Sequence, residues 1–288
     1  MPDVKEVVLE DWESFEGEIS RISEMVAQKK ASPGSISVSD PLFRGQANQC
    51  WPLLTTLERF SKKPYSIEEY HRIVVAVAPA VASLTAKSSF LSPHREINLL
   101  LEDEERRQGD PGKGPRLGPP PWPQHEYEFM IYLRHSGFPS PLLDWSRSPY
   151  VAAFFAFPSR PSESCDKVAL YAYVEYFGSG KLGVGGRAQI TGLGPYARTH
   201  ERHYSQQSQY TICTKSADEE KKYCNHEEAF GGDESQQDLL TKYVIPARQR
   251  DRFLSKLYSL NINAYSLFRD EGSLMQTLAY REIEKQVR

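Results

Sequence analysis

The segment "PLLDWSRSPYVAAFFAF", residues 141–157, constrains the fold more than any other part of the chain. An apolar pair leads into a polar run at residues 144–148, and Pro149 then opens an almost wholly apolar stretch. Proline favours the first turn of a helix and serine its N-cap, so we predict a strand, a turn capped by Ser148 and a buried helix. The N-terminus of such a helix is suited to facing an anion. Capping alone also explains Ser148, though not the density of polar residues beside it.

A second polar cluster, Phe43-Arg44-Gly45-Gln46, follows a strand-like entry. The planar guanidinium of Arg44 offers five donors, and glycine removes the Cβ that would block a close approach, so the cluster suits a phosphate clamp. On spacing alone, a turn with an exposed or salt-bridged arginine is the alternative.

A third cluster, "RTHERHYSQQSQYTIC" at residues 198–213, crowds basic and amide side chains before an expected strand. Gln206 or Gln207 is a candidate to point into a cleft as a hydrogen-bonding group. The pattern by itself equally describes a solvated loop.

Composition and charge exclude several classes of protein. The 288 residues are 39% hydrophobic and 25% charged, which allows a packed core, and a net charge of −3 leaves the choice of partner open. We find no run long enough to span a bilayer and no signal peptide, so we expect a soluble, cytoplasmic protein.

The four cysteines lack CxxC spacing, so free thiols are expected. Cys213, Cys224 and His226 resemble metal ligands only superficially, since no second close pair completes a site, and no metal is expected.

Short strand-like runs lie far apart between amphipathic stretches, which indicates an α+β fold. We predict helices at residues 4–28 and 66–84, the latter with Ser66 as N-cap, and a helix at residues 125–137 that ends at Gly137. Strands are expected at residues 42–44, 167–176, 210–213 and 239–246. Residues 106–123 read as a mobile loop rich in proline and glycine, and residues 217–238 as a polar surface insertion.

The three clusters resemble, in order, the motifs of the FRG domain family. The first motif is an aromatic-Arg-Gly-Gln followed by tryptophan, and the second is a Leu-Leu-Asp-Trp-Ser-x-Ser-Pro run before an apolar helix. The residues that match are Phe43, Arg44, Gly45, Gln46, Trp51, Leu53, Leu57, Arg59, His135, Gly137, Pro139, Leu142, Leu143, Asp144, Trp145, Ser146, Ser148, Pro149, Ala152, Phe155, Ala156, Arg202, Gln206, Gln207, Tyr210, Leu267, Phe268 and Asp270. Arg134 departs from the usual glutamine, Ser140-Pro141 from Thr-Arg and Ser208 from glycine. The resemblance implies an N-terminal helical segment at residues 1–36 and an FRG domain at residues 37–288.

The order of these elements is similar to that of ADP-ribosyltransferases. The similarity implies a single domain of split small β-sheets flanked by helices, with NAD as the substrate. It assigns Arg44 to the diphosphate, with Gly45 clearing the approach, and Ser146 or Ser148 to the nicotinamide ribose. Phe43 and Trp51 are then expected in the core. The expected ligand-binding set is Phe43, Arg44, Gly45, Gln46, Asp144, Trp145, Tyr150 and Gln206.

The remaining expected roles concern the reaction. Tyr150 or Trp145 would stack on the nicotinamide ring. Gln207 would hold a ribose hydroxyl, although an amide cannot act as a base. His135 is a candidate base, and a buried histidine bonded to backbone is its alternative.

The resemblance implies a mono-ADP-ribosyltransferase of the toxin or phage-defence kind, with a nucleic-acid or protein acceptor and an antitoxin or defence partner. Basic residues suited to a polyanion are Lys113, Arg116, Arg198, Arg202 and His203. The alternatives are a non-catalytic module for a nucleotide or nucleotide-sugar, and an interaction scaffold without a ligand.

Overall fold

A computed structural model describes residues 4–33, 38–85, 124–157, 165–177, 186–194, 201–217, 220–230 and 238–284. Its strands are β1 (Lys5–Val8), β2 (Leu42–Gln46), β3 (Leu143–Ser146), β4 (Lys167–Val174), β5 (Gln189–Gly192), β6 (Ser208–Ala217), β7 (Glu220–Tyr223) and β8 (Leu239–Pro246). Its helices are α1 (Trp12–Ala31), α2 (Thr56–Phe60), α3 (Ile67–Thr85), α5 (Gln124–His135), α6 (Pro149–Ala156), α7 (Glu201–Ser205), α8 (Arg250–Ser259), α9 (Ala264–Phe268) and α10 (Glu271–Ala279). Short helical turns follow as η1 (His226–Phe230), η2 (Ala247–Gln249) and η3 (Tyr280–Glu284). The predicted α+β fold is confirmed.

The eight strands form one mixed sheet in the order β1-β8-β4-β2-β3-β6-β5, with β7 added on β6. The pair β1–β8 is parallel, and the other strand pairs are antiparallel. The described strands therefore make a single connected sheet and not two separate small ones.

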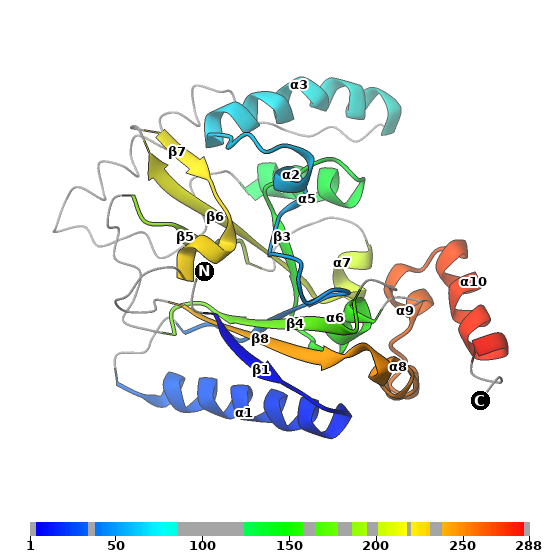
Figure 1. Ribbon diagram of the computed structural model, residues 1–288. Coiled ribbons are helices and arrows are strands. Elements are labelled where there is room, and N and C mark those ends of the chain that lie inside the picture. Colours follow the sequence, from blue (N-terminus) through cyan, green and yellow to red (C-terminus); the bar gives the residue numbers. More distant parts are fainter. Residues whose placement is uncertain are drawn as a thin grey trace.

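The described strands nevertheless share the fewest residue pairs at the centre of the sheet, between β2 and β3. Strands β4 and β8 pair over their full length, whereas β2 and β3 share the single residue pair Phe43–Ser146. Figure 1 shows the consequence, because β4 and β8 run nearly side by side while β3 and β6 are steeply inclined to them. Two halves of the sheet thus diverge from the β2–β3 contact.

One face of the β1-β8-β4-β2 half is covered by α1, α6 and α8. Trp12 and Phe15 of α1 pack on Phe253 of α8, with ring centroids 5.1 and 5.4 Å apart. Residues 4–28 were predicted as one helix, and this is wrong for residues 5–8, which pair with β8. The helix begins at Trp12 because the side chain of Asp11 accepts a hydrogen bond from the Ser14 N–H and caps it.

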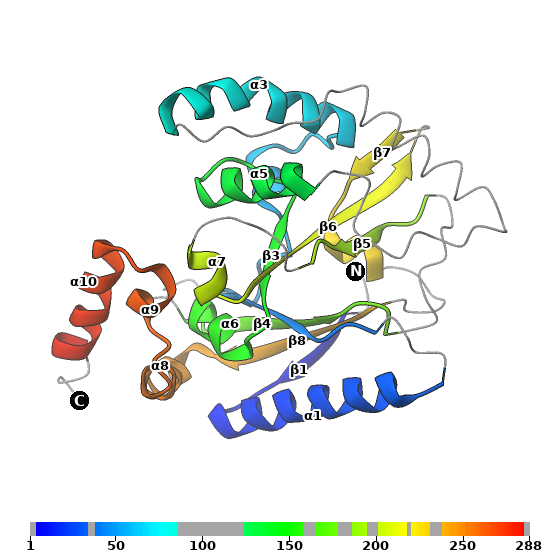
Figure 2. The ribbon, with the colours of Figure 1, turned by 180° about the vertical axis from the view of Figure 1, so that it is seen from behind.

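The other half of the sheet packs against α3 and α5, which share a core cluster with residues of β6 and β7. Both helices lie above β3 in Figure 1 and, from behind, in Figure 2. The predicted capping of α3 is confirmed, since Ser66 and Glu69 each accept a hydrogen bond from the other's backbone N–H. The predicted end of α5 is also confirmed, because Gly137 follows it with φ of +87°.

The predicted surface insertion at residues 217–238 is partly wrong. Strand β7 extends the sheet there, and His226 of η1 is fully buried beneath it. Whether this segment joins the sheet depends on its contacts with distant strands, and the local polarity of its sequence does not reveal those contacts.

The loop at residues 106–123, with Lys113 and Arg116, lies outside the described residues, as does Arg198. In the described ranges, no helix combines the length and the apolar character needed to cross a bilayer.

Gly45 of β2 lies directly against the backbone of α6. A Cβ at this position would come within 1.9 Å of the Ala152 carbonyl oxygen and 2.6 Å of the Ala156 nitrogen. The missing side chain makes room for the helix, while the expectation that Gly45 also clears a path for a ligand stays a prediction. The close approach places α6 directly against β2.

We predict that Gly45→Ala lowers the free energy of unfolding by at least about 2 kcal/mol, because neither backbone atom can move without displacing α6 or β2. Gly17→Ala is the matched control, since a Cβ there meets nothing within 4 Å. In mid-helix, alanine should stabilise slightly. Urea unfolding of the two variants measures the difference, and equal effects would contradict this role for Gly45.

Candidate functional site

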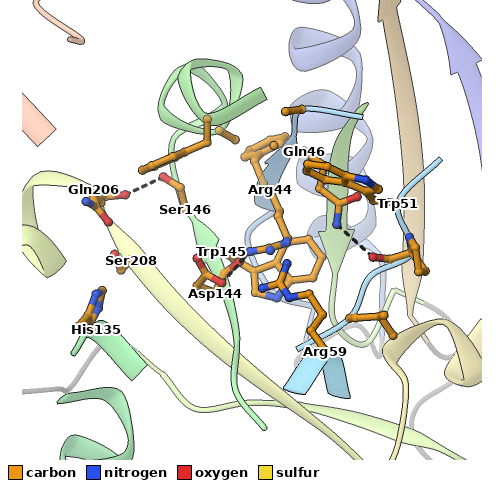
Figure 3. A pocket seen from close by; sticks show the side chains of 17 residues that line it. Arg44, Gln46, Trp51, Arg59, His135, Asp144, Trp145, Ser146, Gln206 and Ser208 are labelled. Atoms are coloured by element: carbon orange, nitrogen blue, oxygen red, sulfur yellow. Dashed lines mark hydrogen bonds and ion pairs between the residues drawn. The ribbon is translucent and has the colours of Figure 1, made fainter. Parts of the chain in front are cut away.

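A cavity of about 440 Å³ opens where β2 and β3 diverge. Its walls come from β2, β3, α6, the segment leading into α2, and the start of β6. Figure 3 shows the Arg44–Asp144 pair near the middle, with Gln46 and Trp51 on one side and His135, Ser146 and Ser208 on the other. The cavity thus joins the first two sequence clusters and the end of the third.

Asp144 is held by two arginines from different elements. Arg44 donates from Nη1 to the Asp144 carbonyl oxygen at 2.8 Å and to its Oδ1 at 2.6 Å. Arg134 of α5 donates to the same Oδ1 and, at 3.0 Å, to the hydroxyl of Thr56. Burial acts to raise the pKa of the Asp144 carboxyl, but the charges of Arg134 and Arg44 lower it well below its usual range. Asp144 is therefore ionised at neutral pH.

Arg59 lies in the last turn of α2 and also lines the cavity. No hydrogen bond or ion pair joins its guanidinium to another described residue. Partial burial and the nearby charges of Arg44 and Arg134 lower its pKa, although an arginine stays protonated. Three guanidinium groups thus lie near one carboxylate, which binds two of them, and positive charge is left at the cavity.

Ser146 and Ser148 both hold the turn that begins α6. The Ser148 side chain accepts a hydrogen bond from the Val151 N–H, as predicted for an N-cap. The Ser146 hydroxyl donates to the Gln206 carbonyl oxygen at 2.8 Å and accepts from the Ser148 N–H at 3.0 Å. Of the two, Ser146 lines the cavity, whereas Ser148 is not among its lining residues.

His135 forms one end of the cavity together with a buried tyrosine. The Tyr210 hydroxyl lies 2.6 Å from Nε2 of His135 and 3.4 Å from Nδ1 of His203. Burial raises the pKa of Tyr210, so its hydroxyl keeps its proton. A phenol has one proton to donate, so at least one of the two ring nitrogens donates to the phenol oxygen. The arrangement fixes the ring of His135.

The aromatic residues at the cavity differ from those expected. Trp51 was predicted in the core and is 52% exposed at the cavity wall, while Phe43 is buried as predicted. Trp51 follows the polar run at residues 46–50 and precedes a proline, so it belongs to a loop with no buried face to join. Phe155 of α6 also lines the cavity and is 38% exposed. Tyr150 instead stacks on Trp12 in the core below, with ring centroids 5.9 Å apart.

Trp145 lines the cavity from a buried position. Its indole N–H donates to the Thr211 hydroxyl at 2.8 Å, and that hydroxyl lies 2.9 Å from Nε2 of His226. Burial and the charge of Arg44 lower the pKa of His226 to about 3, so the ring is neutral. In the sequence, His226 was considered only as a metal ligand, and that role was set aside because no second close pair completes a site.

The third cluster ties the C-terminal segment to the sheet. Arg202 donates to the Phe268 carbonyl oxygen at 3.1 Å and to Asp270, and Gln206 donates to the Leu267 carbonyl oxygen at 3.2 Å. Gln206 lines the cavity, whereas Gln207 is exposed in a turn with φ of +49° and is not among the lining residues. Of the two candidate amides, Gln206 is the one beside the cavity.

The expected ligand-binding and reaction residues did not include Arg59 or Arg134. Arg59 was part of the matched first motif, and that was the available signal. Arg134 departs from the family pattern, and its partner Asp144 lies ten residues further along the chain. Cys213 and Cys224 are free thiols with sulfur atoms 3.5 Å apart. In the part of the chain that the structure describes, no group of three metal-ligating residues occurs.

We predict that His226 makes the stability depend on pH. Its pKa is about 3 when folded against 6.5 when unfolded. The unfolded chain therefore binds the proton more tightly, and stability present above pH 6.5 is lost as the pH falls toward 3, by about 1.4 kcal/mol per pH unit. His226→Gln should show a correspondingly shallower dependence in urea titrations from pH 7 to pH 4. Parallel curves for the two proteins would contradict the prediction.

Comparison with known proteins adds one finding. Residues 39–165 match the model of the FRG domain, and this range contains β2, α2, α3, α5, β3 and α6. Neither the curated proteins nor the solved structures compared with the chain gave a match. Arg44, Arg59, Arg134 and Asp144 all lie in the matched range, whereas β6 and α7 follow it. The chain therefore carries an FRG domain over residues 39–165.

Proposed function

We propose that this protein binds NAD in the cavity between β2 and β3 and transfers its ADP-ribose group to a macromolecular acceptor. The observation that carries the proposal is Arg59, a guanidinium in the cavity wall with no partner among the described residues. Arg44 and Arg134 stand beside it and share a single carboxylate. A diphosphate supplies the negative charge that this arrangement lacks.

The size and lining of the cavity also suit a dinucleotide. Its volume of about 440 Å³ lies in the range of roughly 300–1,000 Å³ typical of small-molecule sites. Trp51 and Phe155 present partly exposed rings, on which a nicotinamide or adenine ring can stack. These two residues replace Tyr150, which packs against the core on Trp12 and is not among the cavity-lining residues, as the candidates for stacking.

The reaction breaks the bond between the nicotinamide nitrogen and C1′ of the ribose. The bonding electron pair leaves with nicotinamide, which departs as a neutral molecule, and C1′ passes through an oxocarbenium-like state. A nucleophilic oxygen or nitrogen of the acceptor forms the new bond to C1′ and gives up its proton. His135 at the cavity end is the candidate to receive this proton, and a nucleic acid or a protein is the acceptor.

A second candidate function is nucleotide binding without catalysis. One observation favours it: of the described residues that line the cavity, Asp144 is the only carboxylate, and two arginines already hold it. Such a site would bind NAD or a nucleotide-sugar and relay its presence to a partner. A toxin or defence role belongs to the transfer reaction and not to this alternative.

We predict that Arg59→Ala weakens NAD binding at least about tenfold, because a hydrogen bond to a charged group contributes roughly 1.5–3 kcal/mol. Arg59 has no partner whose loss would disturb the fold, so the variant should keep the melting temperature of the wild type. Isothermal titration calorimetry measures binding, and nicotinamide release in the presence of DNA, RNA or cell lysate measures transfer. Arg248→Ala is the control, since Arg248 is an exposed arginine paired with Glu10 away from the cavity.

The outcomes separate the two candidates. Nicotinamide release that depends on Arg59 supports transfer. Saturable NAD binding without release under any condition supports the binding module. Wild-type protein that neither binds NAD nor releases nicotinamide contradicts both.

A further inference from the structure

We infer that Asp144 is a subsite for the vicinal hydroxyl groups of a ribose, held by the carboxylate oxygen that its arginines leave open. This inference rests on the proposed nucleotide function, which it deepens by naming the group that recognises the sugar. Arg44 and Arg134 both bond Oδ1. No described residue bonds Oδ2, and the Asp144 side chain is 43% exposed at the cavity.

The side chains of Arg44, Arg134 and Asp144 differ in their exposure to solvent. The side chains of Arg44 and Arg134 are only 11% and 9% exposed, so Asp144 is the most exposed member of the cluster, although Arg44 also lines the cavity. Asp144 therefore presents its second oxygen outward from a fixed position. A group whose sole task was to neutralise the two arginines would have no need of exposure at the cavity.

The charge state of Asp144 decides which ligand group it accepts. The arginine charges lower the pKa of Asp144 well below its usual range despite burial, so the carboxylate stays ionised and acts only as an acceptor. It repels a phosphate and needs a neutral or cationic donor. The two hydroxyl groups of a ribose are such donors, and one carboxylate oxygen has lone pairs for both.

The surroundings of Asp144 divide the cavity into two ends. Arg59 and Trp51 lie on one side of the Arg44–Asp144 pair in Figure 3, while Ser146, Ser208 and His135 lie on the other. A phosphate near Arg59 then places an attached sugar over Asp144 and toward the hydroxyl groups of the serines. The order of these two ends, phosphate near Arg59 and sugar near Asp144, sets the direction in which a nucleotide would lie in the cavity.

The same contact would favour the transfer step. Positive charge develops on the sugar ring as nicotinamide leaves, and a fixed carboxylate within a partly dry cavity stabilises it without having to reorganise. Asp144 would then hold the ribose hydroxyl groups, which is the role that was expected of Gln207. Gln207 is not among the residues that line the cavity.

The first test removes hydroxyl groups from the ligand and leaves the protein unchanged. Wild-type protein is titrated with nicotinamide mononucleotide and ADP, and with the 2′-deoxy and 3′-deoxy form of each. We expect at least about a tenfold loss of affinity for the deoxy forms of the nucleotide whose ribose lies at Asp144. The pair that shows the loss identifies which end of NAD occupies the subsite.

Each result of this series has a distinct meaning. Equal affinities for the ribose and deoxy forms overturn the subsite and leave the proposed NAD function standing. Absence of binding by every nucleotide overturns both. Discrimination against the deoxy forms that survives in Arg59→Ala, with unchanged overall affinity, supports the subsite and overturns the assignment of the phosphate to Arg59.

The second test uses Asp144→Asn, which keeps the shape of the side chain and removes its charge. We expect the variant to bind the ribose and deoxy nucleotides nearly equally and to lose kcat by at least about a hundredfold, with a much smaller change in KM. Asp144→Glu should restore part of the discrimination. A purely structural role would lower stability and leave the preference for the ribose form intact. If Asp144→Asn fails to fold, the ligand series on the wild type still decides.

Discussion

The ion cluster of Arg44, Asp144 and Arg134 joins β2, β3 and α5 at the point where few backbone hydrogen bonds join β2 to β3. Strands β2 and β3 share a single residue pair, so no ladder of backbone hydrogen bonds sets their separation. The cluster bridges β2, β3 and α5 in its place. Arg44 and Arg134 are nearly buried, so removing Asp144 would leave their charges uncompensated and lower the stability of the fold. The cavity exists because side chains, and not a closed ladder, join the two halves of the sheet.

The close contact between Gly45 and α6 sets the second boundary of the cavity. It brings the first turn of α6 beside the end of β3, where Ser146 links the Ser148 backbone to that of Gln206. The wall formed by β2, β3 and α6 is thus fixed by backbone packing and by hydrogen bonds. The opposite wall carries Trp51 and Arg59, which are both exposed. An ordered wall therefore faces one whose charge and ring are accessible from the cavity.

The sequence predicted best those elements whose signals are local. The capped turn before α6, the capping box of α3, the end of α5 and the strand β4 follow from neighbouring residues, and each is present. The errors concern residues whose place depends on distant partners. Residues 5–8 form a strand because β8 pairs with them, and His226 is buried because β6 and η1 meet over it. Trp51 was placed in the core on residue type alone, although it lies in a loop.

What the sequence by itself determined is the local chemistry: the caps, the apolar helix, the Arg-Gly-Gln and Asp-Trp-Ser runs, and their match to the FRG domain. Only the tertiary structure decided which of these groups meet. Arg44 and Asp144 lie 100 residues apart and become partners through the placing of two strands. That placing depends on the packing of whole layers, to which each local sequence contributes little. For this reason the residue types of the site, and a salt bridge as one reading of Arg44, were predictable. The partner of Arg44, the lack of a partner for Arg59 among the described residues and the open oxygen of Asp144 were not.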